Sequence, residues 1–243
     1  NFLYVRQENV PDGYVPTISL PGWEPQAGLE PLIGNPVAST NFYGTRADHD
    51  DVTATMATLQ LEHDLSPGVT ITNIARWGRT DQDYLLTAFM STSGNISATD
   101  PNDLSTYTMA RSLPTVKDQY NIILADQLSV RADFATGAIR HSLVAGVEFV
   151  HEKQKLYDIA VSGSRPAANL YNPDWNDVGD LSWARSGAIR EGSTDTQSAY
   201  IFDTLKFLND TVLVTGGVRV DFYQTDYFAN AVCNAATGRG AVS

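Results

Sequence analysis

Histidine, the residue type most often used for catalysis and metal binding, occurs four times, at His49, His63, His141 and His151. These positions do not have the spacing of a metal site. Glu148 and His151 are three residues apart and His141 precedes Ser142, so on β-strands each pair would point to opposite faces. The acidic run 48–51 is best explained as a solvated loop. No glycine-rich phosphate loop is present. We predict no catalytic residues, no resident metal and no enzymatic activity.

The composition excludes several classes of protein. The chain has 243 residues and a formal net charge of −12, which disfavours binding to nucleic acid. Its single cysteine rules out an internal disulfide framework, and no run of 18 apolar residues predicts a membrane helix. A mean hydropathy of −0.20 suggests a soluble protein. A membrane β-barrel has a similar value, however, because only alternate residues of its strands are apolar.

Period-two alternation is the strongest pattern in the sequence. From Tyr120 to Phe134 the even positions are almost all apolar and the odd positions mostly polar, over more residues than a usual soluble strand. We expect 119–134 and 140–155 to form an antiparallel hairpin. Leu128, Val130, Leu143, Val147 and Phe149 should face outward, and Arg131, Ser142 and Glu148 inward. The alternation predicts seven strands in all: 1–7, 51–64, 69–86, 119–134, 140–155, 194–208 and 211–226.

Short and long connections between these strands alternate strictly. Short turns occur near 65–68, 135–139 and 209–210, and long connections rich in Pro, Gly, Asn, Asp and Ser occur near 9–50, 87–118 and 156–193. All turns would then lie at one end, and the long loops would converge over one mouth at the other. We predict an all-β fold, a transmembrane antiparallel β-barrel. A soluble secreted β-sandwich binding module is the alternative.

Seven strands cannot close a barrel, because both sheet edges would be left unpaired in lipid. The chain also starts inside a strand-like stretch at 2–5 and stops in a Gly- and Ala-rich stretch. We therefore expect it to be part of a longer protein. Residues 1–243 would form part of one barrel domain, with a further loop near 227–243.

Several segments resemble one known family. The segments are Asn9-Val-Pro-Asp-Gly-Tyr14 and its continuation to Gly22, Asn41-Phe-Tyr-Gly44, Leu59 to Leu65, Thr70 to Trp77, Asp83-Tyr-Leu85, Gly137 to His141, Val144 to Phe149, Asn169 to Pro173, Tyr200 to Thr204 and Gly216 to Asp221. With these segments the chain is similar to TonB-dependent outer-membrane transporters, and in particular to siderophore receptors of the Fiu type, which take catecholate siderophores. The resemblance covers nearly the whole chain, and the hairpin formed by its last two segments is its most typical part.

The resemblance implies a 22-stranded barrel closed by an N-terminal plug domain that this chain does not contain. It further implies an active transporter in the bacterial outer membrane, a monomer that contacts lipid and draws energy from the TonB complex through the plug. Iron would arrive inside a ferric catecholate siderophore, so the protein would need no cofactor and no metal ligands. A passive outer-membrane porin is an alternative from another functional class.

Aromatic and arginine side chains in the long loops are the candidate ligand contacts. Aromatic rings can stack on flat catechol rings, and arginine offers a planar cation to a compact anion. We expect a local cationic funnel within the acidic whole. The candidate binding residues are Tyr14, Trp23, Tyr84, Phe89, Arg111, Arg165 and Tyr171.

Cys233 lies in the Gly- and Ala-rich segment after the last predicted strand. A free exposed thiol is unusual in an oxidising compartment, so we do not expect a catalytic role. The resemblance suggests a disulfide with a second cysteine just beyond Ser243.

Overall fold

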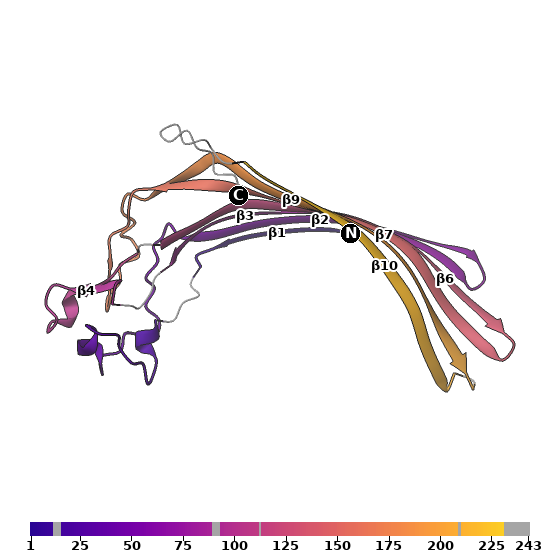
Figure 1. Ribbon diagram of the computed structural model, residues 1–243, viewed down its shortest axis with the longest axis horizontal. Coiled ribbons are helices and arrows are strands. Elements are labelled where there is room, and N and C mark those ends of the chain that lie inside the picture. Colours follow the sequence, from indigo (N-terminus) through magenta and orange to yellow (C-terminus); the bar gives the residue numbers. More distant parts are fainter. Residues whose placement is uncertain (12–15, 89–92, 112, 209, 231–243) are drawn as a thin grey trace.

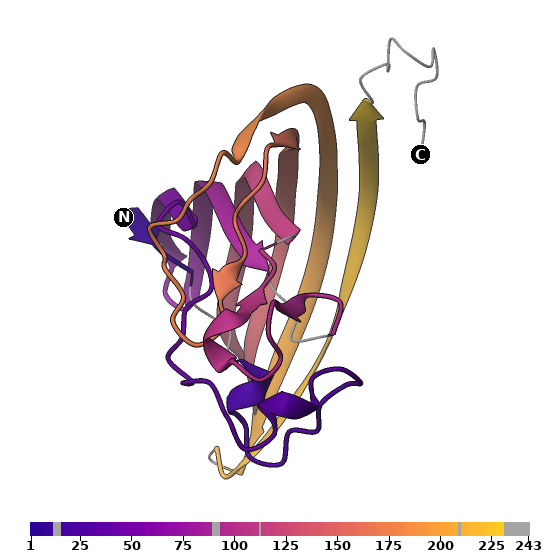
Figure 2. The same ribbon diagram turned by 90° about the vertical axis from the view of Figure 1, so that its left-hand side faces the viewer.

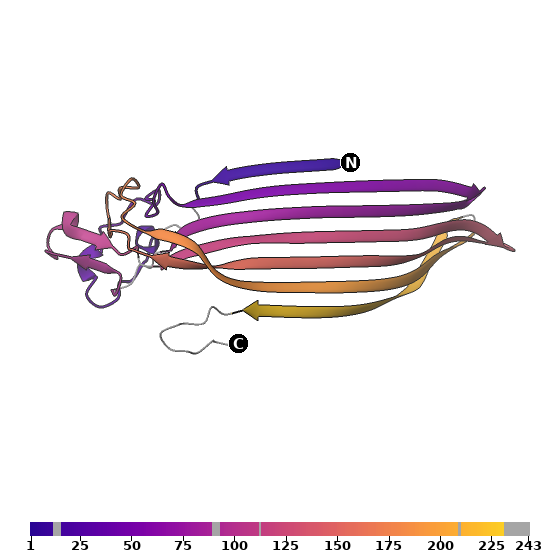
Figure 3. The same cartoon turned by 90° about the horizontal axis from the view of Figure 1, so that it is seen from above.

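The large sheet has seven antiparallel strands in the order β1-β2-β3-β6-β7-β9-β10, laid side by side in Figure 3. The computed structural model describes residues 1–11, 16–88, 93–111, 113–208 and 210–230. Every predicted strand is present, and most run further than the alternation indicated. The strands are β1 (Phe2–Asn9), β2 (His49–Ser66), β3 (Val69–Ala88), β6 (Leu113–Thr136), β7 (Ile139–Ser162), β9 (Ser182–Phe207) and β10 (Val212–Asn230).

The predicted hairpin and its two faces are confirmed. β6 pairs with β7 around a tight turn, and Leu128 lies opposite Val147 in the register. The register puts the residues predicted to face outward on one face of the sheet and those predicted to face inward on the other. We call these the apolar face and the polar face.

The apolar face exposes large hydrophobic side chains along its length. Leu59 is 57% exposed, Leu124 54% and Phe222 70%. Soluble monomeric proteins rarely expose large contiguous apolar patches to water, so this face is suited to contact lipid.

Polar residues that interrupt the apolar face are paired across strands. Asn73 Nδ2 donates to both carboxylate oxygens of Asp126 at 3.1 Å. The Nδ1 of His141 lies 2.7 Å from Asp203 Oδ2, and its ring stacks on Phe134. These partners reduce the cost of placing polar groups against lipid.

Turns and loops lie at opposite ends of the sheet, as the alternation predicted. The connections at 67–68 and 137–138 lie at one end together with the end of β9 at Phe207 and the start of β10 at Val212, and the long loops gather at the other (Figure 1). β7 and β9 have 24 and 26 residues, about twice the length that crosses a membrane. The strands therefore extend well past the bilayer towards the loops.

The long loops pack into one body, which we call the loop cluster: the described residues of 10–48, 93–111 and 163–181 (Figure 2). It contains a small sheet of β4 (Ile96–Ala98), β5 (Tyr107–Met109) and β8 (Ala168–Asn169). Three 3-10 helices complete it: η1 (Thr17–Ser19), η2 (Glu30–Leu32) and η3 (Leu104–Thr106).

The hydrophobic core lies in the loop cluster rather than against the large sheet. Ten buried apolar residues, including Tyr43, Met109 and Leu170, come from all three loops and form one cluster. On the large sheet, the buried apolar residues among those described are Leu85 and Ala188. A β-sandwich would bury one whole face of its sheet, so this distribution argues against that alternative.

The sheet is open in this chain. β1 and β10 each pair with one neighbour among the described strands, which leaves two edges for further strands. No described helix is long and apolar enough to cross a membrane.

Candidate functional site

A hollow of about 640 Å³ lies at the loop ends of β3, β6, β7 and β9. Tyr84 and Lys117 lie opposite each other on the polar face, and Lys117 Nζ is 5.5 Å from the centre of the Tyr84 ring. Arg190 also lines the hollow, and its Nε donates to Asp158 at 2.9 Å. The side chains of Lys117, Arg190, Asp158 and Tyr84 thus place two cations, one carboxylate and an aromatic ring at the end of the large sheet that adjoins the loops.

A chain of amide hydrogen bonds crosses the polar face next to this hollow. Gln154 donates to Gln119 at 3.2 Å, Gln119 to Gln82 at 3.0 Å, and Gln82 to Asp50 at 2.9 Å. The chain joins β7, β6, β3 and β2 in sequence. It gives the polar face a continuous row of hydrogen-bonding groups at this level of the strands.

Arg111 ties the three loops together from inside the loop cluster. Its guanidinium donates to the carbonyls of Tyr43 at 2.8 Å, Asp174 at 2.7 Å and Asp177 at 3.1 Å, with longer contacts to those of Gly44 and Pro166. The residue is 4% exposed. Burial lowers the pKa of Arg111 from its usual value, but an arginine side chain stays protonated inside a protein.

Arg165 is buried beside the same loops and forms an ion pair with Asp48, Nη1 to Oδ1, at 2.8 Å. Burial also lowers the pKa of Arg165. The guanidinium therefore faces the interior of the loop cluster rather than its surface.

Trp23 and Tyr171 pack against the hydrophobic core of the loop cluster. The Tyr171 hydroxyl donates to the Asn35 carbonyl at 2.8 Å, and burial raises the Tyr171 pKa. Both residues are partly exposed.

The five candidate binding residues that the structure describes therefore do not form one constellation. Tyr84 lines the wall hollow, Trp23 and Tyr171 lie at the margin of the loop core, and Arg111 and Arg165 lie inside the cluster. Tyr14 and Phe89 lie outside the described residues, as does Cys233.

Sequence reasoning missed Lys117 and the glutamines as candidate contacts. Lys117 fell inside a segment predicted as loop, although it shares the strand parity of Gln119. Extending the alternation upstream of Tyr120 would have placed it on the polar face with Tyr84.

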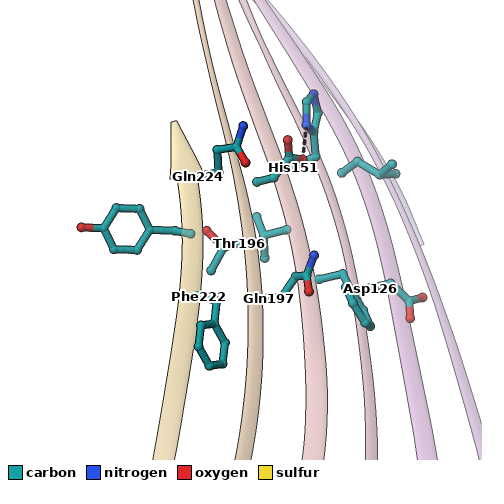
Figure 4. A pocket seen from close by; sticks show the side chains of 11 residues that line it. Asp126, His151, Thr196, Gln197, Phe222 and Gln224 are labelled. Carbon is teal, nitrogen blue, oxygen red and sulfur yellow. Dashed lines mark hydrogen bonds and ion pairs between the residues drawn. The ribbon is translucent and has the colours of Figure 1, made fainter. Parts of the chain in front are cut away.

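A second hollow, of about 580 Å³, lies among strands β6, β7, β9 and β10 (Figure 4). Phe149 and Phe222 flank Gln197 in the register, and His151 Nδ1 lies 2.7 Å from Asp195 Oδ1. These residues belong to the apolar face. The hollow is therefore on the opposite side of the sheet from Tyr84, and we do not assign the site to it.

Among the described residues, no group of three or more His, Cys, Asp or Glu side chains is arranged to hold a metal ion.

The family described as "TonB dependent receptor-like, beta-barrel" matches residues 7–243 of the chain. Among curated relatives, the catecholate siderophore receptor Fiu of Escherichia coli O6:H1 is 43% identical over 100% of this chain and 31% of its own length. The probable TonB-dependent receptor BfrD of Bordetella pertussis is 29% identical over 91% of the chain and 30% of its own. The chain thus spans about a third of the length of these relatives.

Solved structures agree in fold. The ferric-catecholate import receptor Fiu from E. coli K12, in both a closed and an open form, matches the whole chain with a TM-score of 0.88 and 40% identity. The chain covers 34% of the closed form and 36% of the open form. The siderophore receptor PiuA from Acinetobacter baumannii matches 94% of this chain with a TM-score of 0.64 and 16% identity, and the match covers 36% of PiuA. At this low identity the match supports the fold alone.

Proposed function

The chain belongs to the TonB-dependent receptor-like β-barrel family, and from this premise we propose that the protein it forms part of binds ferric siderophores of the catecholate class and imports them with energy from the TonB complex. The family lies in the outer membrane of Gram-negative bacteria, so the apolar face of the sheet is in contact with lipid. Iron travels inside its chelator, and the transport step makes and breaks no covalent bond.

The hollow at the loop ends of the polar face is the observation that carries this proposal. Ferric catecholates are compact anions with flat aromatic rings. Lys117 and Arg190 offer positive charge beside the Tyr84 ring, and Asp158 offsets only one of the two charges. A cation and an aromatic surface together suit an anionic aromatic ligand better than either does alone.

The buried arginines have a supporting part in this proposal. Arg111 and Arg165 contribute to binding by holding the three loops in place over the wall. Trp23 and Tyr171 present their exposed ring surfaces at the margin of the loop core. Tyr14 and Phe89 stay predictions from the sequence.

The test is iron uptake by cells that lack their own catecholate receptors and express the full-length receptor containing this chain. We expect saturable uptake of a ferric catecholate complex that stops when the TonB complex is absent. Uptake that is unsaturable and independent of TonB would indicate a passive porin. Folded receptor that neither binds nor imports any ferric siderophore would refute the proposal.

A further inference from the structure

The ladder between β7 and β9 is irregular beside the hollow at the loop ends of the strands. The register shifts between Tyr157 and Ile159 on β7. In this interval β7 has one residue, Asp158, and β9 has three, 186–188. Such a β-bulge bends the strand that carries the extra residues and re-aims the side chains around it, and β9 arches towards its loop end in Figure 2. Asp158 and Ser186 both line the hollow, so the bulge shapes one side of it.

Asp158 occupies one edge of the Arg190 guanidinium. Nε and Nη2 of Arg190 both donate to Oδ1 of Asp158, at 2.9 Å and 2.5 Å. The Arg190 side chain is 52% exposed and that of Asp158 is 33% exposed. An ion pair so open to water is weak, because water and salt screen it. An incoming anion can therefore compete with the Asp158 carboxylate for Arg190.

The carboxylate of Asp158 also sets the net charge of the hollow. The charged residues of the lining are Lys117, Arg190 and Asp158, which together give +1. If Asp158 were neutral, the same lining would have a charge of +2. The repulsion from one carboxylate is proportional to the charge of the ligand. Asp158 therefore weakens the binding of a trianion much more than that of a monoanion, and it has no such effect on a neutral complex.

We propose that Asp158 is a specificity-determining residue, which competes with the ligand for Arg190 and restrains the preference of the hollow for highly charged complexes. The proposal rests on the proposed function, because it takes the hollow as the siderophore site. Specificity of this kind comes from a repulsive group placed beside the attractive ones. The bulge supplies that group at the position where Lys117 and Arg190 meet the ligand.

Two iron complexes of nearly the same shape separate charge from other contributions to binding. Ferric tris-catecholate is a trianion, and ferric tris-tropolonate is neutral, although both present flat rings around the metal. Asp158→Asn keeps an acceptor oxygen for Arg190 and removes only the charge. In the folded full-length receptor it should tighten binding of tris-catecholate by at least about fivefold. Binding of tris-tropolonate should stay within about twofold of wild type.

Asp118→Asn is the matched control. Asp118 also accepts from an arginine, Arg185, at 2.5 Å, but it has the strand parity of the apolar face. The same substitution there should leave both affinities unchanged. Asp158→Glu keeps the charge and should keep the wild-type preference between the two complexes.

The direction of the change distinguishes a competing carboxylate from a merely structural ion pair. If Asp158 only held Arg190 in place, Asp158→Asn would weaken binding of tris-catecholate. Weaker or unchanged binding of tris-catecholate, or equal tightening of both complexes, would overturn the proposal. The gain should also shrink as salt is raised, because the lining is exposed to screening; a gain independent of salt would count against it.

Heat-modifiable migration on detergent gels confirms that each barrel is folded. If Asp158→Asn fails this check, Asp158→Ser takes its place with the same expectation. Wild-type receptor that binds neither complex would refute the proposed function. Wild-type receptor that binds tris-catecholate, with a folded Asp158 variant that does not bind it more tightly, would leave the proposed function standing and refute the role of Asp158.

Discussion

Replacing Arg111 with alanine should release the three loops from one another while leaving the barrel intact. Arg111 makes three contacts of 3.1 Å or less to carbonyls of the first and third loops. Each charge-assisted hydrogen bond contributes about 1.5–3 kcal/mol, and the buried Tyr43 carbonyl loses its bond to the guanidinium. The loss exceeds the ~1.4 kcal/mol that corresponds to a tenfold change in an equilibrium constant.

The assay compares protease cleavage of the loops and ligand affinity in the same folded receptor. Arg111→Ala should be cleaved at least about tenfold faster in 10–48 and 163–181. The double change Arg111→Ala with Arg165→Ala should weaken binding of a ferric catecholate by at least about tenfold. Arg111→Lys should fall between, because an ammonium offers three donors instead of five. Wild-type cleavage and affinity in the double variant, with the barrel intact, would refute the reasoning.

Other parts of the structure give further predictions. Asp203→Ala should lower barrel stability by roughly 1–3 kcal/mol, because the Nδ1 atom of His141 loses its partner on the apolar face. The loss would be seen as earlier disappearance of the heat-modifiable gel form, and equal stability would contradict it. Gly179→Ala should speed protease cleavage of the third loop, because Gly179 has a positive φ and no room for a Cβ. Gly28→Ala is the control for steric crowding, because Gly28 also has a positive φ but lies in open space. This control should have a smaller effect on cleavage. The hydrogen bonds from Ser164 lower the pKa of Asp180. The stability that the ionised carboxylate gives to the third loop is therefore present above the ordinary pKa, near pH 4, and is lost as the pH falls through the pKa of the folded state. Asp180→Asn should make the cleavage rate of the third loop insensitive to acid in this range.

Alternation predicted the membrane-facing part of the fold because lipid imposes a strict rule there. Every second residue must be apolar, and the residues from Tyr120 to Phe134 follow this rule closely. Above the bilayer both faces of a strand meet water, so the rule disappears. The upper part of β6, which includes Pro114 and Lys117, therefore looked like loop although it pairs with β3.

The loop cluster could not be predicted in the same way. Arg111 contacts the Asp174 carbonyl, 63 residues further along the chain, and no local pattern encodes such a contact. Their residue type suggested that Arg111 and Arg165 contact a ligand. Residue type alone does not show whether a side chain is buried, and both arginines are buried in the structure. Tyr84 was found because it lies where a strand enters its loop. Its neighbour Lys117 needed the observed register.

Equilibrium binding of a ferric tris-catechol complex to the purified full-length receptor tests whether the hollow beside Tyr84 binds the ligand. The double variant Lys117→Ala with Arg190→Ala removes both cations from the hollow. Lys153→Ala is the matched control, since Lys153 lies on the opposite face of β7 and pairs with Glu191. We expect at least about tenfold weaker binding in the double variant and wild-type affinity in the control. Equal affinity in all three proteins would contradict it.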